Sequence, residues 1–183
     1  MEPISVKLED IGPEGVSFCL NLEPQALDLS DSNDARFLGP INAEATIRKA
    51  GRKLRLSMSV NFTAALACSR CLAETEHRLG ESADLTLIRG QPILPPELRL
   101  EEKDLTTQFF SGEEIDLAPF LREMVILAMP IKPLCDPDCK GLCPVCGADR
   151  NRETCEHVPV AEKEEEATDP RWSKLRELMN RKR

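Results

Sequence analysis

Residues 53–67, KLRLSMSVNFTAALA, alternate between apolar and polar side chains over most of their length. Because successive side chains of a strand point to opposite faces, this alternation predicts one long strand with a buried face and a solvated face. Such a pattern is typical of antiparallel sheets. The predicted buried set is Leu54, Leu56, Met58, Val60, Phe62, Ala64 and Leu66.

The segments on either side extend the sheet. Residues 43–50 alternate in the same way and lead to Gly51, which predicts a hairpin. The sequence CSRC at 68–71 is a second predicted turn, followed by a returning strand between 75 and 90. Two earlier segments, ISVKL and VSFCL, alternate with period two as well. The predicted fold is α+β, an antiparallel β-meander or barrel-like sheet with one main helix and a cysteine-rich zinc-knuckle region.

One helix is predicted after the sheet. From Leu117 to Met129 apolar residues recur at helical spacing, and Pro130 ends the segment. Residues 89–114 contain three prolines and an acidic run and are predicted to be an irregular connector with a short strand at 108–110. We expect residues 1–158 to form a single β-rich zinc-binding domain. The apolar helix positions are Leu117, Phe120, Leu121, Met124, Leu127 and Ala128, and the domain is followed by an acidic linker at 159–170 and a basic helix or tail at 171–183.

Eight cysteines dominate the chemistry of the chain. No secretory signal is recognised, so we expect a cytoplasmic protein, in which clustered thiols bind metal instead of forming disulfides. Cys19 stands apart and is predicted to be an ordinary strand residue. The other seven cysteines and one histidine supply the eight donors that two tetrahedral zinc sites require. The predicted ligands are Cys68, Cys71, Cys135, Cys139, Cys143, Cys146, Cys155 and His157.

Two pairings of these ligands are open. The first joins the knuckle CPVC at 143–146 to CEH at 155–157, and joins CSRC at 68–71 to CDPDC at 135–139. The second places the four cysteines between 135 and 146 on one ion. We prefer the first pairing, because the second requires the knuckle at 68–71 to find its remaining donors over a longer reach.

The same residues argue against an enzyme. A catalytic zinc keeps an open coordination position and a nearby general base, whereas each predicted ion here has four protein ligands. Zinc deaminases require a His-x-Glu motif, which the sequence does not contain. His77 is predicted to be an exposed strand residue, with a role as substitute ligand left open. We therefore expect neither catalysis nor a small-molecule substrate.

Three motifs together resemble the YceD family, the large ribosomal RNA subunit accumulation proteins. They are ACSRCL at 67–72, EIDLAPFLREMVILAMPIKPLC at 114–135 and CDPDCKGLCPVCGADRNRETCEH at 135–157. The segment DPRWSKLREL at 169–178 resembles the closing motif of bacterial members, and the likeness covers roughly residues 40–180. His157 departs from the pattern, since members commonly have a second cysteine there, but histidine is an equally competent zinc donor.

This resemblance implies a cytoplasmic bacterial protein with plastid relatives, needed for normal large-subunit rRNA levels and so for ribosome biogenesis. The implied partners are large-subunit rRNA precursor or ribosomal proteins, and no membrane is expected. Charge favours such partners, because residues 171–183 carry a net +5 in a chain whose formal charge is −8. The predicted partner-binding residues are Arg171, Trp172, Lys174 and Arg176.

Two other mechanisms are open. One is direct RNA binding by a zinc-ribbon module, with phosphate contacts from arginine and lysine side chains at the knuckles. The other is a protein–protein adaptor that affects rRNA indirectly. The knuckle cations are Arg70, Lys140, Arg150 and Arg152.

Overall fold

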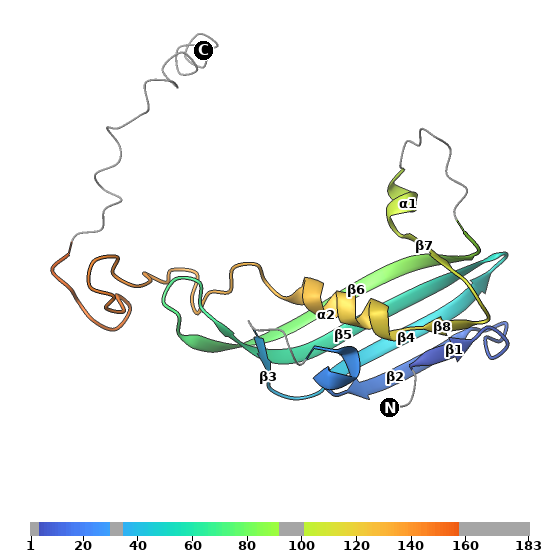
Figure 1. The fold of residues 1–183 in the computed structure, drawn as a ribbon, viewed down its shortest axis with the longest axis horizontal. Coiled ribbons are helices and arrows are strands. Elements are labelled where there is room, and N and C mark those ends of the chain that lie inside the picture. Colours follow the sequence, from blue (N-terminus) through green and yellow to red (C-terminus); the bar gives the residue numbers. More distant parts are fainter. Residues whose placement is uncertain (1–3, 30–34, 92–100, 158–183) are drawn as a thin grey trace, which may run out of the picture. The chain divides into compact units, whose positions relative to one another are not determined.

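The computed structural model describes residues 4–29, 35–91 and 101–157 (Figure 1). The chain divides into two compact units. The first runs to Ser69 and continues from Ala73 to Cys135, and it holds all the described helices and strands. The second consists of Arg70–Leu72 and the residues from Asp136 onward.

A six-stranded sheet forms the body of the first unit, with the order β2-β4-β5-β6-β7 and with β3 also paired to β5. The pairing is antiparallel between β2, β4, β5 and β6, whereas β7 runs parallel to β6. The predicted meander is therefore confirmed as the centre of a mixed sheet, which stays open and does not close on itself. The strands are β2 (Val16–Leu22), β3 (Ala35–Phe37), β4 (Ile41–Ala50), β5 (Lys53–Ala67), β6 (Glu74–Arg89) and β7 (Thr107–Phe110).

The long strand predicted from the alternating segment is β5, which pairs over its whole length with β6. All seven predicted positions are buried, with Leu56, Val60 and Ala64 each fully buried, and Ala65, which was not predicted, is buried as well. The hairpin before it closes through Gly51 and Arg52, since Ala50 pairs with Lys53. Gly51 has a φ of 65°, a value that glycine adopts without steric cost and that this two-residue turn requires at its first position.

Short elements occupy part of the region predicted to be an irregular connector. Helix α1 (Glu102–Leu105) precedes β7, which corresponds to the expected short strand. Strand β8 (Glu114–Asp116) follows and pairs with β1 (Ser5–Lys7) in a separate two-stranded sheet. A 3₁₀ helix, η1 (Pro24–Leu27), connects β2 toward β3.

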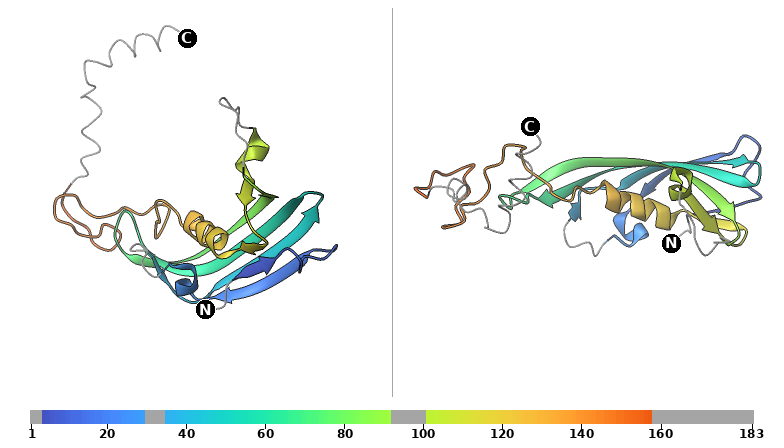
Figure 2. Two further views of the ribbon diagram at one scale, coloured as in Figure 1. Left: turned by 45° about the vertical axis from the view of Figure 1, so that its right-hand side comes forward. Right: turned by 90° about the horizontal axis from the view of Figure 1, so that it is seen from above.

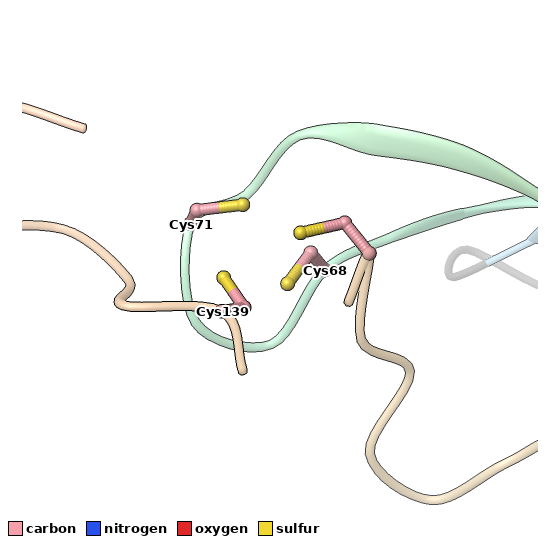
Figure 3. Close-up of side chains that lie close together, drawn as sticks. Cys68, Cys71 and Cys139 are labelled. Carbon is pink, nitrogen blue, oxygen red and sulfur yellow. The ribbon is translucent and has the colours of Figure 1, made fainter. Parts of the chain in front are cut away.

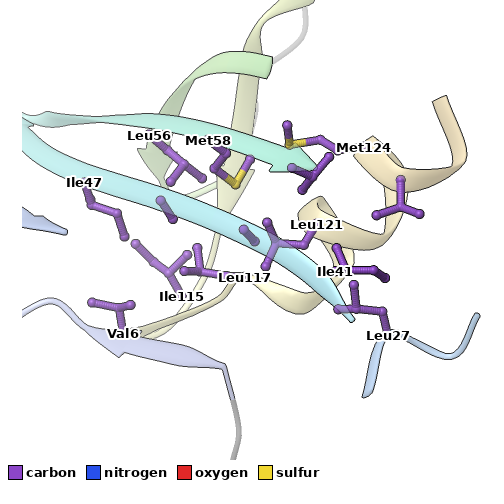
Figure 4. Close-up of a cluster of buried hydrophobic side chains, with 14 of the residues drawn as sticks. Val6, Leu27, Ile41, Ile47, Leu56, Met58, Ile115, Leu117, Leu121 and Met124 are labelled. Atoms are coloured by element: carbon purple, nitrogen blue, oxygen red, sulfur yellow. The ribbon is translucent and has the colours of Figure 1, made fainter. Parts of the chain in front are cut away.

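The main helix, α2 (Ala118–Ala128), packs on one face of the sheet and contacts β6, β5 and η1. Figure 4 shows Leu117, Leu121 and Met124 directed into the same cluster as Leu56 and Met58 of β5. The predicted helix is confirmed, but its apolar face differs. Val125 is fully buried, whereas Leu127 is 68% exposed, because the helix turns the 121–125 side toward the sheet.

The opposite face of the sheet carries polar side chains, and no described element covers it (Figure 2). Serine, threonine and asparagine lie opposite one another there, as in the pairs Ser17–Thr46 and Asn21–Asn42, which are hydrogen-bonded at 3.0 and 3.3 Å. Among the described residues, no helix combines the length and apolar character needed to cross a membrane.

Candidate metal centre

Cys68 and Cys71 lie on the turn between β5 and β6. Both sulfur-bearing residues are buried, at 0% and 7% exposure. The backbone N–H of Cys68 donates to the carbonyl of Ala73 at 2.9 Å, which closes the turn. Leu72 adopts a φ of 60°, a left-handed conformation that is unusual for leucine, and its side chain is 67% exposed. The turn therefore keeps both thiols inward while the backbone takes a strained conformation.

An aspartate turn positions Cys139. The Asp136 side chain accepts a hydrogen bond from the backbone N–H of Asp138 at 2.8 Å, and its carbonyl accepts one from Cys139 at 3.0 Å. Aspartate commonly forms such turns with the backbone two residues ahead. Cys139 is only 4% exposed as a result, whereas Cys135, one residue before the turn, is exposed.

These four cysteines form the first candidate group. The sulfur atoms of Cys68, Cys71, Cys135 and Cys139 all lie within 4.8 Å of one another. Figure 3 shows those of Cys68, Cys71 and Cys139 directed toward a common centre. Four sulfurs bound tetrahedrally to zinc at about 2.3 Å would be separated by about 3.8 Å, which is compatible with sulfur atoms that all lie within 4.8 Å of one another.

Side chains near Cys139 hold its loop in place. The Asn151 amide donates to the Cys139 sulfur at 3.3 Å, while its oxygen accepts the backbone N–H of Lys140 at 2.8 Å. The Arg70 guanidinium donates to the carbonyl of Cys139 at 2.8 Å. Hydrogen bonds of this kind orient metal ligands and stabilise thiolate charge. Sequence reasoning missed Asn151, because nothing in the local pattern relates it to a cysteine 12 positions earlier.

The second candidate group consists of Cys143, Cys146, Cys155 and His157, whose ligand atoms also lie within 4.8 Å of one another. Its knuckle is closed by two 2.8 Å backbone hydrogen bonds, from Cys143 to the carbonyl of Ala148 and from Gly147 to the carbonyl of Cys143. Gly147 has a φ of 73°, which explains the glycine after the second thiol. Cys143 is buried, Cys155 is half-buried, and Cys146 and His157 are exposed.

Hydrogen bonding prepares one thiol of this group for ionisation. The backbone N–H groups of Cys146 and then Val145 donate to the Cys143 sulfur and lower the pKa of that thiol to about 6. A hydrogen bond from the Ala148 backbone lowers the pKa of Cys146. It is outweighed by the side-chain hydrogen bond with Cys143, by partial desolvation of the sulfur and by the charge of neighbouring thiolates, so the pKa of Cys146 is raised. Since the thiolate is the form that binds metal, the lowered pKa favours Cys143 as a metal ligand.

The structure therefore brings the eight predicted ligands into two groups of four, in the arrangement of the preferred pairing. Either group could hold a metal ion, and the ligand roles of the individual residues stay a prediction. Cys19 lies exposed on β2, in neither group. His77 is a strand residue of β6 as predicted, but it is half-buried and not exposed, and its ring nitrogen hydrogen-bonds Thr75 at 2.9 Å. The predicted partner-binding residues Arg171, Trp172, Lys174 and Arg176 lie outside the described residues.

Four soft donors per group suit a structural ion. Tetrahedral zinc is satisfied by four cysteine or histidine ligands, which leaves no coordination position for a substrate. The donors belong to segments far apart in sequence, since the first group joins residues 68–71 to residues 135–139. An ion bound there would cross-link the chain over more than 60 residues.

Comparison with known proteins identifies a family. The family model described as large ribosomal RNA subunit accumulation protein YceD matches residues 56–179, more than half of the 183 residues. An uncharacterized protein of Mycobacterium tuberculosis is 34% identical over 115 residues, which cover 61% of this chain and 49% of that protein. The chain spans about half the length of the curated relatives it matches.

Two plant relatives carry a functional name. The Arabidopsis thaliana and Zea mays proteins are both called large ribosomal RNA subunit accumulation protein YCED homolog 1, chloroplastic. Each is 26% identical to this chain, over 147 and 144 residues that cover 64% and 66% of it and 43% and 49% of the plant proteins. No solved structure matches the chain.

Proposed function

The chain belongs to the YceD family, and from this premise we propose that it is a non-enzymatic, zinc-binding factor that supports accumulation of large-subunit ribosomal RNA. It would act in ribosome biogenesis by binding components of the assembling large subunit. The observation that carries the proposal is the pair of four-donor groups within the region matched by the family model. The names of the plant relatives supply the link to rRNA.

Zinc has a structural role in this proposal. Both groups consist of thiols and one imidazole, the donors that favour zinc over magnesium or calcium. The ion would hold the Cys-rich loops in one conformation, because metal binding supplies free energy of folding, on the order of 10 kcal/mol in small zinc modules. No step of the proposed function requires a reaction at the metal.

The proposed partners are large-subunit rRNA precursor or ribosomal proteins in the cytoplasm. Residues 1–170 carry a formal charge of −13, which favours basic proteins, whereas the +5 of residues 171–183 favours RNA or an acidic surface. Within the basic segment we propose contacts from Arg171, Trp172, Lys174 and Arg176. Tryptophan and arginine are the residue types that most often dominate binding energy at interfaces.

Direct RNA contact through the knuckle cations is less favoured as a mechanism. The Arg70 guanidinium donates to the carbonyls of Cys139 and Pro137, so part of its hydrogen-bonding capacity is used within the loop. Arg152 lies 3.6 Å from the Asp149 carboxylate. A protein–protein adaptor that affects rRNA indirectly therefore ranks as the second mechanism.

The proposal is tested by depleting the protein in its host and measuring the ratio of large to small ribosomal RNA. Wild-type protein and the Cys19→Ser variant should restore the ratio, since Cys19 belongs to neither group. A variant with both Cys68→Ser and Cys143→Ser should fail to do so. An unchanged ratio on depletion would refute the proposed function.

Crosslinking in cells, followed by recovery of the tagged protein, separates the two mechanisms. Enrichment of large-subunit rRNA precursor supports binding to the assembling subunit, whereas recovery of protein partners alone supports the adaptor. The same experiment without residues 171–183 measures the contribution of the basic segment. We expect that deletion to weaken partner recovery and to leave the unfolding midpoint of the remaining chain unchanged.

A further inference from the structure

The tip of the β4–β5 hairpin carries an unusual density of positive charge. Residues 48–55, RKAGRKLR, contain five basic side chains and no acidic one, and residues 45–73 contain no aspartate or glutamate in a chain with 32 of them. All five side chains are exposed, and the hairpin lies at an end of the sheet (Figure 1). We call Arg48, Lys49, Arg52, Lys53 and Arg55 the basic tip.

The basic tip is not neutralised within the described part of the chain. Two other arginines of the same sheet have carboxylate partners there, Arg36 with Glu74 at 2.9 Å and Arg89 with Glu113 at 3.4 Å, whereas Arg78 has no ion pair among the described residues. No ion pair of the described residues involves the basic tip. Arg48 and Arg55 are in addition paired directly opposite each other in the β4–β5 register. Like charges directly opposite each other destabilise a sheet, and an anion bound between the two guanidinium groups would offset that repulsion.

A hollow on the uncovered face of the sheet adjoins the two opposed arginines. Its volume is about 600 Å³, and its lining includes Arg48, Arg55 and the hydroxyl-bearing residues Thr46 and Thr86. One carboxylate, that of Asp84, also lines it and accepts a hydrogen bond from the Ser57 hydroxyl. Guanidinium groups and hydroxyls all donate hydrogen bonds, which is the chemistry that an oxyanion such as phosphate requires.

We propose that the basic tip binds the phosphate backbone of RNA, with one phosphate seated between Arg48 and Arg55. The choice of RNA as the polyanion rests on the proposed function. Clustered arginine and lysine side chains bind nucleic acid mainly by neutralising phosphates and releasing counterions. Arginine also suits phosphate geometrically, because its planar fork donates two parallel hydrogen bonds.

Within residues 1–170, charge would confine this contact to the basic tip. Residues 1–170 carry a formal charge of −13 even with the five cations of the basic tip included, so the remainder of these residues repels a polyanion on average. The tip also lies at the far end of β5 from Cys68, a separation along the 15-residue strand of roughly 50 Å. RNA bound at the tip is therefore distinct from any contact made at the Cys68 end of the strand.

The test is the salt dependence of RNA affinity for the zinc-loaded full chain, with a fluorescent single-stranded RNA as probe. The tip variant carries Arg52→Gln and Lys53→Gln, two exposed positions at the hairpin turn. Each single-strand phosphate contact contributes about 0.7 to the slope of log affinity against log salt, so two lost contacts should reduce the slope by about 1.4. At 0.1 M salt this corresponds to about 25-fold weaker binding.

A matched control separates a local site from net charge. The variant Arg122→Gln with Lys132→Gln removes the same charge from exposed positions outside the basic tip. A smaller slope in the tip variant alone supports the proposal. The proposal is overturned if the tip variant binds like wild type, if both variants weaken equally, or if polyglutamate at equal charge competes as well as RNA.

Folding and the proposed function are read separately. Thermal unfolding should show the same midpoint for both double variants and wild type. If the midpoint of the tip variant is lower, the single variant Arg52→Gln takes its place in the binding assay, with half the expected change in slope. Wild-type protein that binds no RNA overturns this inference and leaves the adaptor mechanism in place. The rRNA ratio after depletion tests the proposed function by itself.

Discussion

Replacing one cysteine of either group should remove the zinc ion of that group and leave the ion of the other group bound. We expect two ions per wild-type chain, and one ion in each of the variants Cys68→Ser and Cys146→Ser. The two replacements differ in burial, because Cys68 is fully buried and Cys146 is exposed. This difference predicts unequal effects on stability, which can be separated by measuring unfolding with zinc and with a chelator.

The magnitude follows from linkage and from burial. With free zinc buffered at about 1,000 times the dissociation constant of a site, bound metal stabilises the folded chain by about 4.1 kcal/mol, and each variant loses that amount. In chelator this contribution vanishes for all proteins. Cys146→Ser should then match wild type within about 0.5 kcal/mol. Cys68→Ser should still be destabilised by about 1–3 kcal/mol, because serine places a more polar group where no water reaches it.

The assay combines zinc content by native mass spectrometry with urea unfolding under both conditions. Cys19→Ser is the control, since Cys19 lies exposed on β2 and should keep both ions and full stability. Loss of both ions from either single variant would refute two independent groups of four. Wild-type protein without zinc would refute the metal assignment itself.

Three further perturbations test particular contacts. Asn151→Ala removes the amide donor 3.3 Å from the Cys139 sulfur and should weaken zinc binding at the first group by about 10-fold to 100-fold, measured by chelator competition. Equal weakening at both groups would contradict this role. Gly15→Ala should lower the free energy of unfolding in urea by more than about 2 kcal/mol, because the added Cβ would lie 2.6 Å from a β4 carbonyl oxygen. Gly51→Ala is the control: its Cβ would meet no atom within 4 Å, and it should cost about 1 kcal/mol. Equal losses would exclude the clash as the cause. Leu121→Ala should lower the free energy of unfolding by about 2–5 kcal/mol, because Leu121 is fully buried on α2. Leu127→Ala, at an exposed position of the same helix, should change it by no more than about 0.5 kcal/mol. A comparable loss at both positions would refute the packing of α2.

Local patterns predicted the regular elements well. The alternation over residues 53–67 matches β5, and the helix expected from Leu117 to Met129 is α2 at Ala118–Ala128. Both patterns depend on which side chains of one segment can face a core together, so the information lies within a few turns or residue pairs. The spacing of the cysteines likewise predicted two groups of donors, because a knuckle is a property of four consecutive residues.

Periodicity did not predict which helix face is buried. Leu127 and Val125 both fit a helical apolar stripe, and packing against β5 and β6 buries only Val125. The parallel pairing of β7 with β6 was also absent from the predicted antiparallel meander. These choices depend on contacts between segments whose distance in sequence carries no local signal.

The sequence by itself determined the long central strand, the main helix and the types of metal donor, because each follows from residue chemistry at short range. Tertiary structure decided which candidate donors meet, that Asn151 supports Cys139, and that Arg48 and Arg55 lie directly opposite each other in the sheet. The physical reason is that register and packing are set by the joint burial of residues far apart in the chain. A sequence pattern shows which side chains favour burial or a partner of opposite charge, but it does not show which distant segment packs against them or provides that partner.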